Sequence, residues 1–421
     1  MKQNCGLHPT STEERILSLD VLRGVAVLGI LIVNIQLFAM IDSAYLNPAA
    51  FGDLSGLNGW VWYITHLVAD AKFITIFSIL FGAGVVLMAD RARAQGRSGA
   101  SLHYRRMFWL LLFGLIHAYL LWYGDILVTY AICGICIYPL HRLRNRWLIP
   151  LALFLILIPS LLMSGLAATV PFWPAEEVAA FRADGLPDEA DIERQLEIYR
   201  GGWLDQIGHR AFNAIFFQIF LLLFLNFWRV SGLMLLGMVF LRWGVLQAQR
   251  GMGLYLLMVV AGCAVGLPLI AYGVAVTIEH DWDPIYVTFT GMQYNYWGSL
   301  FVAAAWIGAI MIVSKTGWAL LQPLVVALAA TGRMAFTNYL AQTLICCFVF
   351  YGYGLGYFGY LDRWEQALVV LGIWALQLIS SQWWLTRFRY GPMEWLWRSL
   401  VLWKRQPMRN NDTSLSPDGS A

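Results

Sequence analysis

The stretch GVAVLGILIVNIQLFAMI, residues 24–41, decides the fold class. It contains no charged side chain, and its length approaches the roughly 20 apolar residues that a membrane-spanning helix needs. Arg23 stands directly before it, and the stretch lacks the small-residue cleavage site of a signal peptide. The sequence therefore predicts an uncleaved first span.

The rest of the chain has the same character. Of its 421 residues, 59% are hydrophobic and 13% are charged, about half the charge of a globular domain. This composition excludes large soluble domains, and a net charge of +3 gives no reason to expect nucleic-acid binding. We predict an all-α, polytopic transmembrane helical bundle of about ten spans in a lipid bilayer, at residues 24–41, 60–89, 107–122, 126–140, 147–170, 230–246, 252–278, 296–314, 334–357 and 366–386.

Arg and Lys in short loops predict which ends of the spans face the cytoplasm. Arg clusters lie at 91–106 and 142–146 and in the C-terminal tail, whereas residues 174–210 hold nine acidic and four basic residues. The expected organisation is a five-span half (1–170), an external acidic loop followed by a re-entrant or interfacial segment (171–228), a second five-span half (229–390) and a cytoplasmic tail (391–421). Both termini would be cytoplasmic.

This charge pattern requires an odd number of crossings between Arg210 and Arg250, yet two apolar runs lie there. We therefore predict that residues 230–246 cross and that residues 211–227 are re-entrant or interfacial, since half-crossing backbone needs protein around it. Residues 318–330 are likewise expected at the cytoplasmic interface.

Ionisable groups at membrane depth are candidate functional residues. His66 and Asp70 stand four residues apart, so one helix face can hold a histidine and its orienting carboxylate. Alternatively, the membrane begins near Leu67, His66 is interfacial and Asp70 pairs with a nearby cation such as Lys72. His117 precedes a tight turn and Asp125 follows it, which places both at similar depth.

Each of these residues also has a structural interpretation. An isolated membrane histidine such as His117 often only bonds neighbouring helices, and Arg333 and Asn338 belong to a polar stripe that can do the same. Arg23 and Asn34 lie three turns apart on one helix face, with Asp20 one turn before Arg23. Arg23 marks either an anion site or simply the inner membrane boundary. Since no Cys or His residues have structural-zinc spacing, we expect no metal site.

Several motifs resemble the YeiB-like bacterial membrane proteins, which are grouped under domain of unknown function 418. The motifs run from the opening Arg15-x-x-x-Leu19-Asp20-x-Leu22-Arg23-Gly24 through Gly114-Leu115-Ile116-His117 and Gly332-Arg333-Met334-Ala335 to the block at residues 388–398. That family is distantly similar to the acyltransferase-3 proteins and to the lysosomal enzyme that N-acetylates heparan glucosamine.

The resemblance implies transfer of an acyl group from cytosolic acyl-CoA to an unknown envelope acceptor. Arg15, Asp20 and Arg23 would bind the donor, with Lys72, Arg333 and Asn338 as further binding residues. The related enzymes have a catalytic histidine where this chain has Asn34. Since an amide is no base near pH 7, we expect Asn34 to position a carbonyl.

The base would then be His117 first and His66 second, each oriented by its carboxylate, Asp125 or Asp70. Two other functions stay open. A transporter or flippase would use the same buried polar groups as a substrate path. A non-catalytic assembly protein would use them only to hold its helices together.

Overall fold

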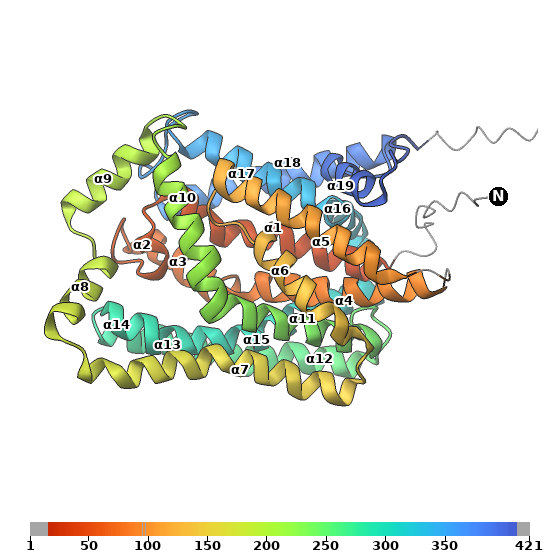
Figure 1. Cartoon of the computed structure of the whole chain (residues 1–421), viewed down its shortest axis with the longest axis horizontal. Helices are drawn as coiled ribbons and strands as arrows, with labels where there is room; N and C mark the ends of the chain where they lie inside the picture. The colour runs from red at the N-terminus through yellow and green to blue at the C-terminus, as the bar shows by residue number, and fades with distance from the viewer. Residues whose placement is uncertain (1–15, 95, 97, 411–421) are drawn as a thin grey trace, which may run out of the picture.

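The computed structural model of the chain describes residues 16–94, 96 and 98–410. Its long helices lie side by side along one axis (Figure 1). In chain order the helices of regular α, 3-10 or π geometry are α1 (Leu17–Ala39), α2 (Ser43–Leu46), α3 (Gly56–Val68), α4 (Lys72–Ala94), α5 (Gly99–Ile116), η2 (His117–Leu121), α6 (Leu127–Ile137), η3 (Tyr138–Arg142), α7 (Asn145–Thr169), η4 (Val170–Phe172), α8 (Ala175–Gly185), α9 (Glu189–Arg200), α10 (Ile207–Phe216), η5 (Phe217–Asn226), α11 (Phe227–Arg242), α12 (Met252–Ala261), η6 (Gly262–Gly266), α13 (Leu267–Glu279), α14 (Pro284–Tyr286), η7 (Val287–Gly291), α15 (Met292–Thr316), η8 (Ala319–Leu321), α16 (Gln322–Arg333), α17 (Ala335–Phe350), α18 (Arg363–Arg387) and α19 (Pro392–Leu402).

The bundle has two ends, which we name by residues near the two ends of α1. At the Arg23 end, α1 begins and α19 lies close by; at the Asp42 end lie α8 and α9 (Figure 1). Within the described residues no strand is present, apart from a single bridge between Phe388 and Arg409. The chain is therefore an all-α helical bundle, as its composition predicted.

Seven helical stretches are long and apolar enough to cross a membrane, or eight if one bent pair counts as a span. The ten expected runs exceed this number by two, at residues 107–122 and 126–140. The first falls in α5 and η2, where Arg105 and Arg106 occupy the early turns, and the second falls in α6, which has only 11 residues. Leaving out both runs removes two crossings, so the sides of the membrane expected for the other segments do not change.

Residues 211–227, which we predicted to be re-entrant or interfacial, form no separate segment in the structure. They belong to one helical stretch, Ile207–Arg242, of 36 residues, about 54 Å long at 1.5 Å per residue. Two of its arginines donate to other helices: Arg210 Nε donates to Tyr119 O at 2.9 Å, and Arg229 donates to Ser299 Oγ at 2.7 Å. One helical stretch is thus long and apolar enough for the single crossing that the charge pattern predicts.

The bent pair is α16 and α17, which meet at 84° around Met334. Residues 318–330, expected at the interface, lie in η8 and α16, and α16 packs closely on α1. A Cβ on Gly332 would lie 1.9 Å from Asp20 O, and one on Gly24 would lie 2.0 Å from Leu328 O. Only glycine allows these two backbones to touch, as is common between membrane helices.

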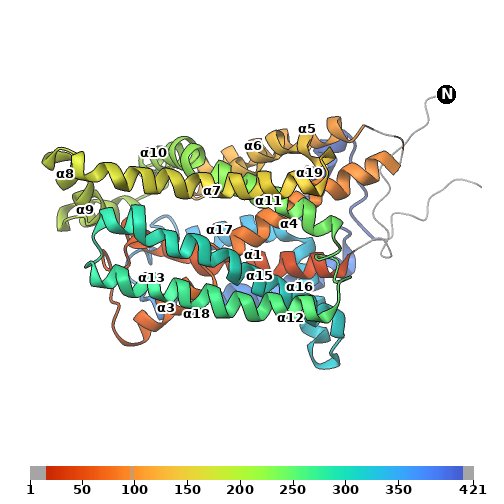
Figure 2. The same ribbon diagram turned by 90° about the horizontal axis from the view of Figure 1, so that it is seen from below.

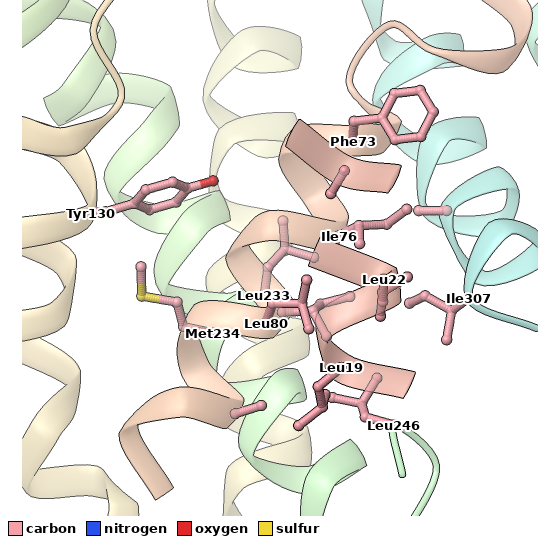
Figure 3. Close-up of a cluster of buried hydrophobic side chains, with 14 of the residues drawn as sticks. Leu19, Leu22, Phe73, Ile76, Leu80, Tyr130, Leu233, Met234, Leu246 and Ile307 are labelled. Carbon is pink, nitrogen blue, oxygen red and sulfur yellow. The ribbon is translucent and has the colours of Figure 1, made fainter. Parts of the chain in front are cut away.

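The core lies where α1, α4 and α11 meet. Figure 3 shows Leu19 and Leu22 of α1, Ile76 and Leu80 of α4, and Leu233 of α11 gathered there. By contrast, α7, α12–α13 and α18 each bury only 22% of their apolar segment inside the protein, and they lie on the outside of the bundle (Figure 2). Their apolar surfaces fit a bilayer environment, so the chain is a multi-pass membrane protein.

Candidate functional site

The second long apolar helix is broken at residues 69–71, between α3 and α4. Ala71 takes a φ of 63°, which residues other than glycine rarely adopt. The Asp70 N–H donates one residue further back than in a regular helix, so the His66 carbonyl loses its usual partner. Lys72 Nζ supplies the missing donor at 2.6 Å.

The Asp70 carboxylate in this break is held from three sides. His66 Nδ1 lies 3.1 Å from Asp70 Oδ2, Asn295 Nδ2 donates to the same oxygen at 2.8 Å, and the Tyr45 hydroxyl donates to Oδ1 at 3.1 Å. Lys72 Nζ also donates to Asn295 Oδ1 at 2.6 Å. The break and α15 therefore fix the position of one carboxylate and one imidazole.

The His66 ring has one nitrogen free for other chemistry. Its Nδ1 faces the carboxylate, while Nε2 makes no hydrogen bond within the part of the chain that the structure describes. The ring stacks on Trp62 with centroids 5.2 Å apart, and its side chain is 23% exposed. A carboxylate at Nδ1 favours the proton there, which leaves the Nε2 lone pair available as a base.

His66 and Asp70 line a cavity of about 330 Å³ enclosed by α1, α3, α4, α7, α11, α13 and α15. This is within the usual range for small-molecule sites, about 300–1,000 Å³. Polar groups lie among apolar walls, which include Ile30, Val33, Phe73, Met163, Leu233 and Val274. The cavity can therefore hold a ligand with both polar and apolar parts.

Asn34 lines the same cavity from α1. Its side chain is half-buried and makes no hydrogen bond to another described residue. An amide N–H that faces a cavity without a partner can donate to the carbonyl oxygen of a ligand. The structure thus brings Asn34, His66 and Asp70 to one site, although they come from α1, α3 and the break.

Arg229, which the sequence analysis did not select, also lines this cavity. It donates to Tyr296 O at 3.0 Å and to Ser299 Oγ at 2.7 Å, and its guanidinium lies 4.1 Å from the Tyr296 ring centroid. None of these partners is a carboxylate. The sequence signal for Arg229 is a charged residue between the apolar runs 211–227 and 230–246, a pattern that also fits a boundary between two segments.

The second expected pair is elsewhere and has a different environment. His117 Nδ1 lies 2.8 Å from Asp125 Oδ1, and His117 Nε2 lies 2.9 Å from Thr343 Oγ1 of α17. Asp125 Oδ2 accepts the Val128 N–H at 2.8 Å at the start of α6. The His117 and Asp125 side chains are each 1% exposed, and neither lines the cavity. Both ring nitrogens are already occupied.

The expected donor-binding residues lie at the Arg23 end. Arg23 Nη1 donates to Asp20 Oδ1 at 3.0 Å, and Arg333 Nη2 donates to Arg389 O at 3.5 Å. Arg15 lies outside the described residues.

Two of the expected binding residues are buried instead. Asn338 Nδ2 donates to Ser381 Oγ at 3.0 Å, so it joins α17 to α18. Lys72 is fully buried and does not line the cavity. Its ammonium instead supports the helix break, donating to the His66 carbonyl and to Asn295 Oδ1.

The chain is similar to other proteins over nearly the whole of both chains. Residues 240–404 match the family described as "Protein of unknown function (DUF418)". The uncharacterized protein YeiB of Escherichia coli (strain K12) is 33% identical over 400 residues, which cover 92% of this chain and 97% of that protein. The uncharacterized protein YxaH of Bacillus subtilis (strain 168) is 31% identical over an alignment that covers 96% of this chain and 98% of that protein.

Proposed function

We propose that this chain, which belongs to the YeiB-like DUF418 family of membrane proteins, transfers an acyl group from acyl-CoA to an envelope acceptor. Since the relatives YeiB and YxaH are themselves uncharacterized, the proposal is argued from the cavity. The observation that carries the proposal is a carboxylate-oriented histidine with a free nitrogen, beside an unpaired amide, in a cavity of about 330 Å³. The acyl-CoA donor comes from the resemblance to membrane acyltransferases, and the bacterial inner-membrane location from the resemblance to the YeiB-like bacterial membrane proteins.

In the proposed reaction His66 acts as the general base. Its Nε2 takes the proton from an acceptor hydroxyl or amine, which attacks the thioester carbonyl carbon. The C–S bond then breaks, and the thiolate of coenzyme A receives the proton from His66. Asp70 stabilises the imidazolium, and the Asn34 N–H donates to the carbonyl oxygen as its charge develops.

The geometry favours His66 over His117 for this role. His66 has a free Nε2 at the cavity, whereas both nitrogens of His117 are bonded in a closed part of the bundle. Arg23 and Asn34 are eleven residues apart on α1, about 16 Å along the helix. An acyl-CoA donor held at the Arg23 end would therefore reach the cavity with its extended pantetheine arm.

Coenzyme A release tests the proposal. The protein in lipid nanodiscs is given labelled acetyl-CoA and an envelope extract; we expect release that His66→Gln and Asp70→Asn abolish. His280→Gln is the matched control, because His280 is exposed and does not line the cavity. Folded wild-type protein that neither binds acetyl-CoA nor releases coenzyme A with any extract would overturn the proposal.

A transporter or flippase is a second candidate, favoured by the 84° bend between α16 and α17. Bent or broken helices occur in transporters where backbone lines a substrate path. This function predicts movement of a substrate across proteoliposomes with no change in its covalent structure. Mass spectrometry of the transported material therefore separates the two candidates.

A further inference from the structure

Arg229 of α11 is a buried cation in the wall of the cavity, and the proposed reaction does not use it. Its Nη1 donates to Tyr296 O at 3.0 Å, and its Nη2 donates to Ser299 Oγ at 2.7 Å and to Thr75 Oγ1 at 3.3 Å. All three acceptors are neutral. Because arginine keeps its proton in proteins, these bonds hold the guanidinium between α4, α11 and α15 without cancelling its charge.

The carboxylate of the cavity does not cancel this charge by contact either. Asp70 is the acidic residue among the described residues that line the cavity, and its two oxygens already take part in three short contacts. Within the described part of the chain, neither Arg229 nor Lys72 forms an ion pair with a carboxylate. Two basic side chains therefore stand around one carboxylate whose oxygens are occupied.

Arg229 also keeps N–H groups that a ligand can use. A guanidinium has five N–H donors, and its three hydrogen bonds use only Nη1 and Nη2. The Nε atom makes no hydrogen bond to a described residue, yet neighbouring atoms do not seal it off. A charged donor of this kind forms its strongest hydrogen bonds with an anionic oxygen.

Asn226 adds a neutral donor beside this cation. It lies three residues before Arg229 on the same helical stretch, so the two side chains are neighbours on one helix face, and both line the cavity. The Asn226 side chain is half-buried and makes no hydrogen bond to another described residue. This part of the wall therefore offers donors from a cation and an amide, and no acidic side chain.

We propose that the acceptor bound in this cavity carries an anionic oxygen group, a carboxylate or a phosphate, and that Arg229 binds it. The proposal rests on the proposed function, since it names the class of acceptor that His66 would deprotonate. An anion at Arg229 Nε supplies the counter-charge that the wall lacks. A hydroxyl or amine elsewhere on the same molecule stays available to His66, so Arg229 determines specificity and takes no part in bond making.

Binding of small hydroxylated probes tests the proposal, with the full chain in phosphatidylcholine nanodiscs and no acyl-CoA present. Glycerol, glycerate and glycerol phosphate all carry hydroxyl groups, but only the last two carry an anionic group. Saturation-transfer NMR titrations measure the Kd of each probe. We expect at least one anion to bind about 10-fold more tightly than glycerol, because a hydrogen bond to a charged group is gained. The anion that shows this preference identifies the group as carboxylate or phosphate.

Variants of Arg229 show whether this residue is the cause. Arg229→Gln should remove the preference and leave glycerol binding unchanged. Arg229→Lys keeps the charge but loses the Nε donor, so a folded variant with an intermediate preference supports a direct contact. Arg144→Gln, which removes the same charge from an exposed position, should keep the wild-type preference.

Wild-type protein that binds neither anion more tightly than glycerol would overturn the proposal, whether or not the variants fold. So would an equal loss of preference in Arg144→Gln. Coenzyme A release separates this proposal from the proposed function on which it rests. Release that proceeds equally with uncharged acceptors keeps acyl transfer and rejects the anionic acceptor, whereas anion-selective binding without any release keeps the Arg229 site and rejects acyl transfer.

Discussion

Two histidine–aspartate pairs of nearly equal geometry lie in this bundle, and they differ in what surrounds them. His66 and Asp70 are 3.1 Å apart beside a cavity, and each side chain is about one-fifth exposed. His117 and Asp125 are 2.8 Å apart and sealed, with Thr343 on the remaining ring nitrogen. A short contact to a carboxylate does not by itself make a catalytic base; the second nitrogen must also be free.

The two pairs also stand on different backbone. His66 precedes a break in a long apolar helix and Asp70 lies within it; there the Lys72 side chain takes the place of a backbone donor to the His66 carbonyl. Asp125 instead caps the first turn of α6 through Val128 N. The first pair therefore depends on irregular structure, which is typical of functional sites, whereas the second strengthens regular structure.

The largest expected effect is on catalysis at the open pair. His66→Gln should lower coenzyme A release about 100- to 10,000-fold, the usual contribution of a general base. The unfolding midpoint should stay near the wild-type value, because the ring stacks on Trp62 and faces the cavity. Equal loss of activity in folded His117→Gln would reverse the assignment of the two pairs.

The sealed pair should show its effect in stability. His117→Ala leaves the Asp125 carboxylate buried without its ring partner, so we expect a loss of about 3 kcal/mol in the free energy of unfolding. A thiol-reactive dye can follow unfolding through the buried Cys133, Cys346 and Cys347. His66→Ala, measured in the same way, should lose much less.

Spacing predicted the two contacts but not the difference between them. Four residues on a helix bring His66 to Asp70, and the turn at residues 122–126 brings His117 to Asp125, as expected. The partner on the other side of His117, Thr343, is 226 positions away. Only tertiary packing could show that this histidine was saturated.

The break at residues 69–71 had no signal in the sequence either. Neither glycine nor proline occurs there, although Ala71 takes a left-handed conformation. The Lys72 ammonium donates to Asn295 Oδ1 and to the His66 carbonyl, which the break leaves without a backbone donor. Composition was enough for the helical bundle, but this polar network required partners more than 200 residues apart.

A third histidine–aspartate pair at the Asp42 end extends the comparison to pH. Asp42 accepts from His209 Nε2 at 2.9 Å, Asn213 Nδ2 at 2.8 Å and the Tyr123 hydroxyl at 2.5 Å. Burial alone would raise the pKa of Asp42, but hydrogen bonds from these donors, His209 foremost, hold the pKa below its usual value.

Because the folded state lowers this pKa, the carboxylate stabilises the protein above the unfolded pKa near 4, and that contribution is lost as pH falls. Asp42→Asn should cost about 2 kcal/mol at pH 7 and should flatten the fall of the unfolding midpoint between pH 5 and pH 3. An unchanged slope in Asp42→Asn would show that other carboxylates control acid unfolding.

The smallest effect concerns strain in the break that carries the open pair. Ala71 has a φ of 63°, a conformation that costs a residue with a side chain about 1 kcal/mol or more. Ala71→Gly should therefore raise stability, by less than about 1 kcal/mol because glycine is more flexible in the unfolded chain. Thermal unfolding measures the change.

Ala69→Gly is the matched control for this strain, because Ala69 lies two residues away with an ordinary φ of −118° and is buried. It should lower stability by about 1 kcal/mol, since it adds flexibility and removes a packed methyl group. Opposite signs for the two glycines would place the strain at Ala71 itself. Equal losses would show that residues 69–71 depend on packing instead, and that the open and sealed pairs stand on equally relaxed backbone.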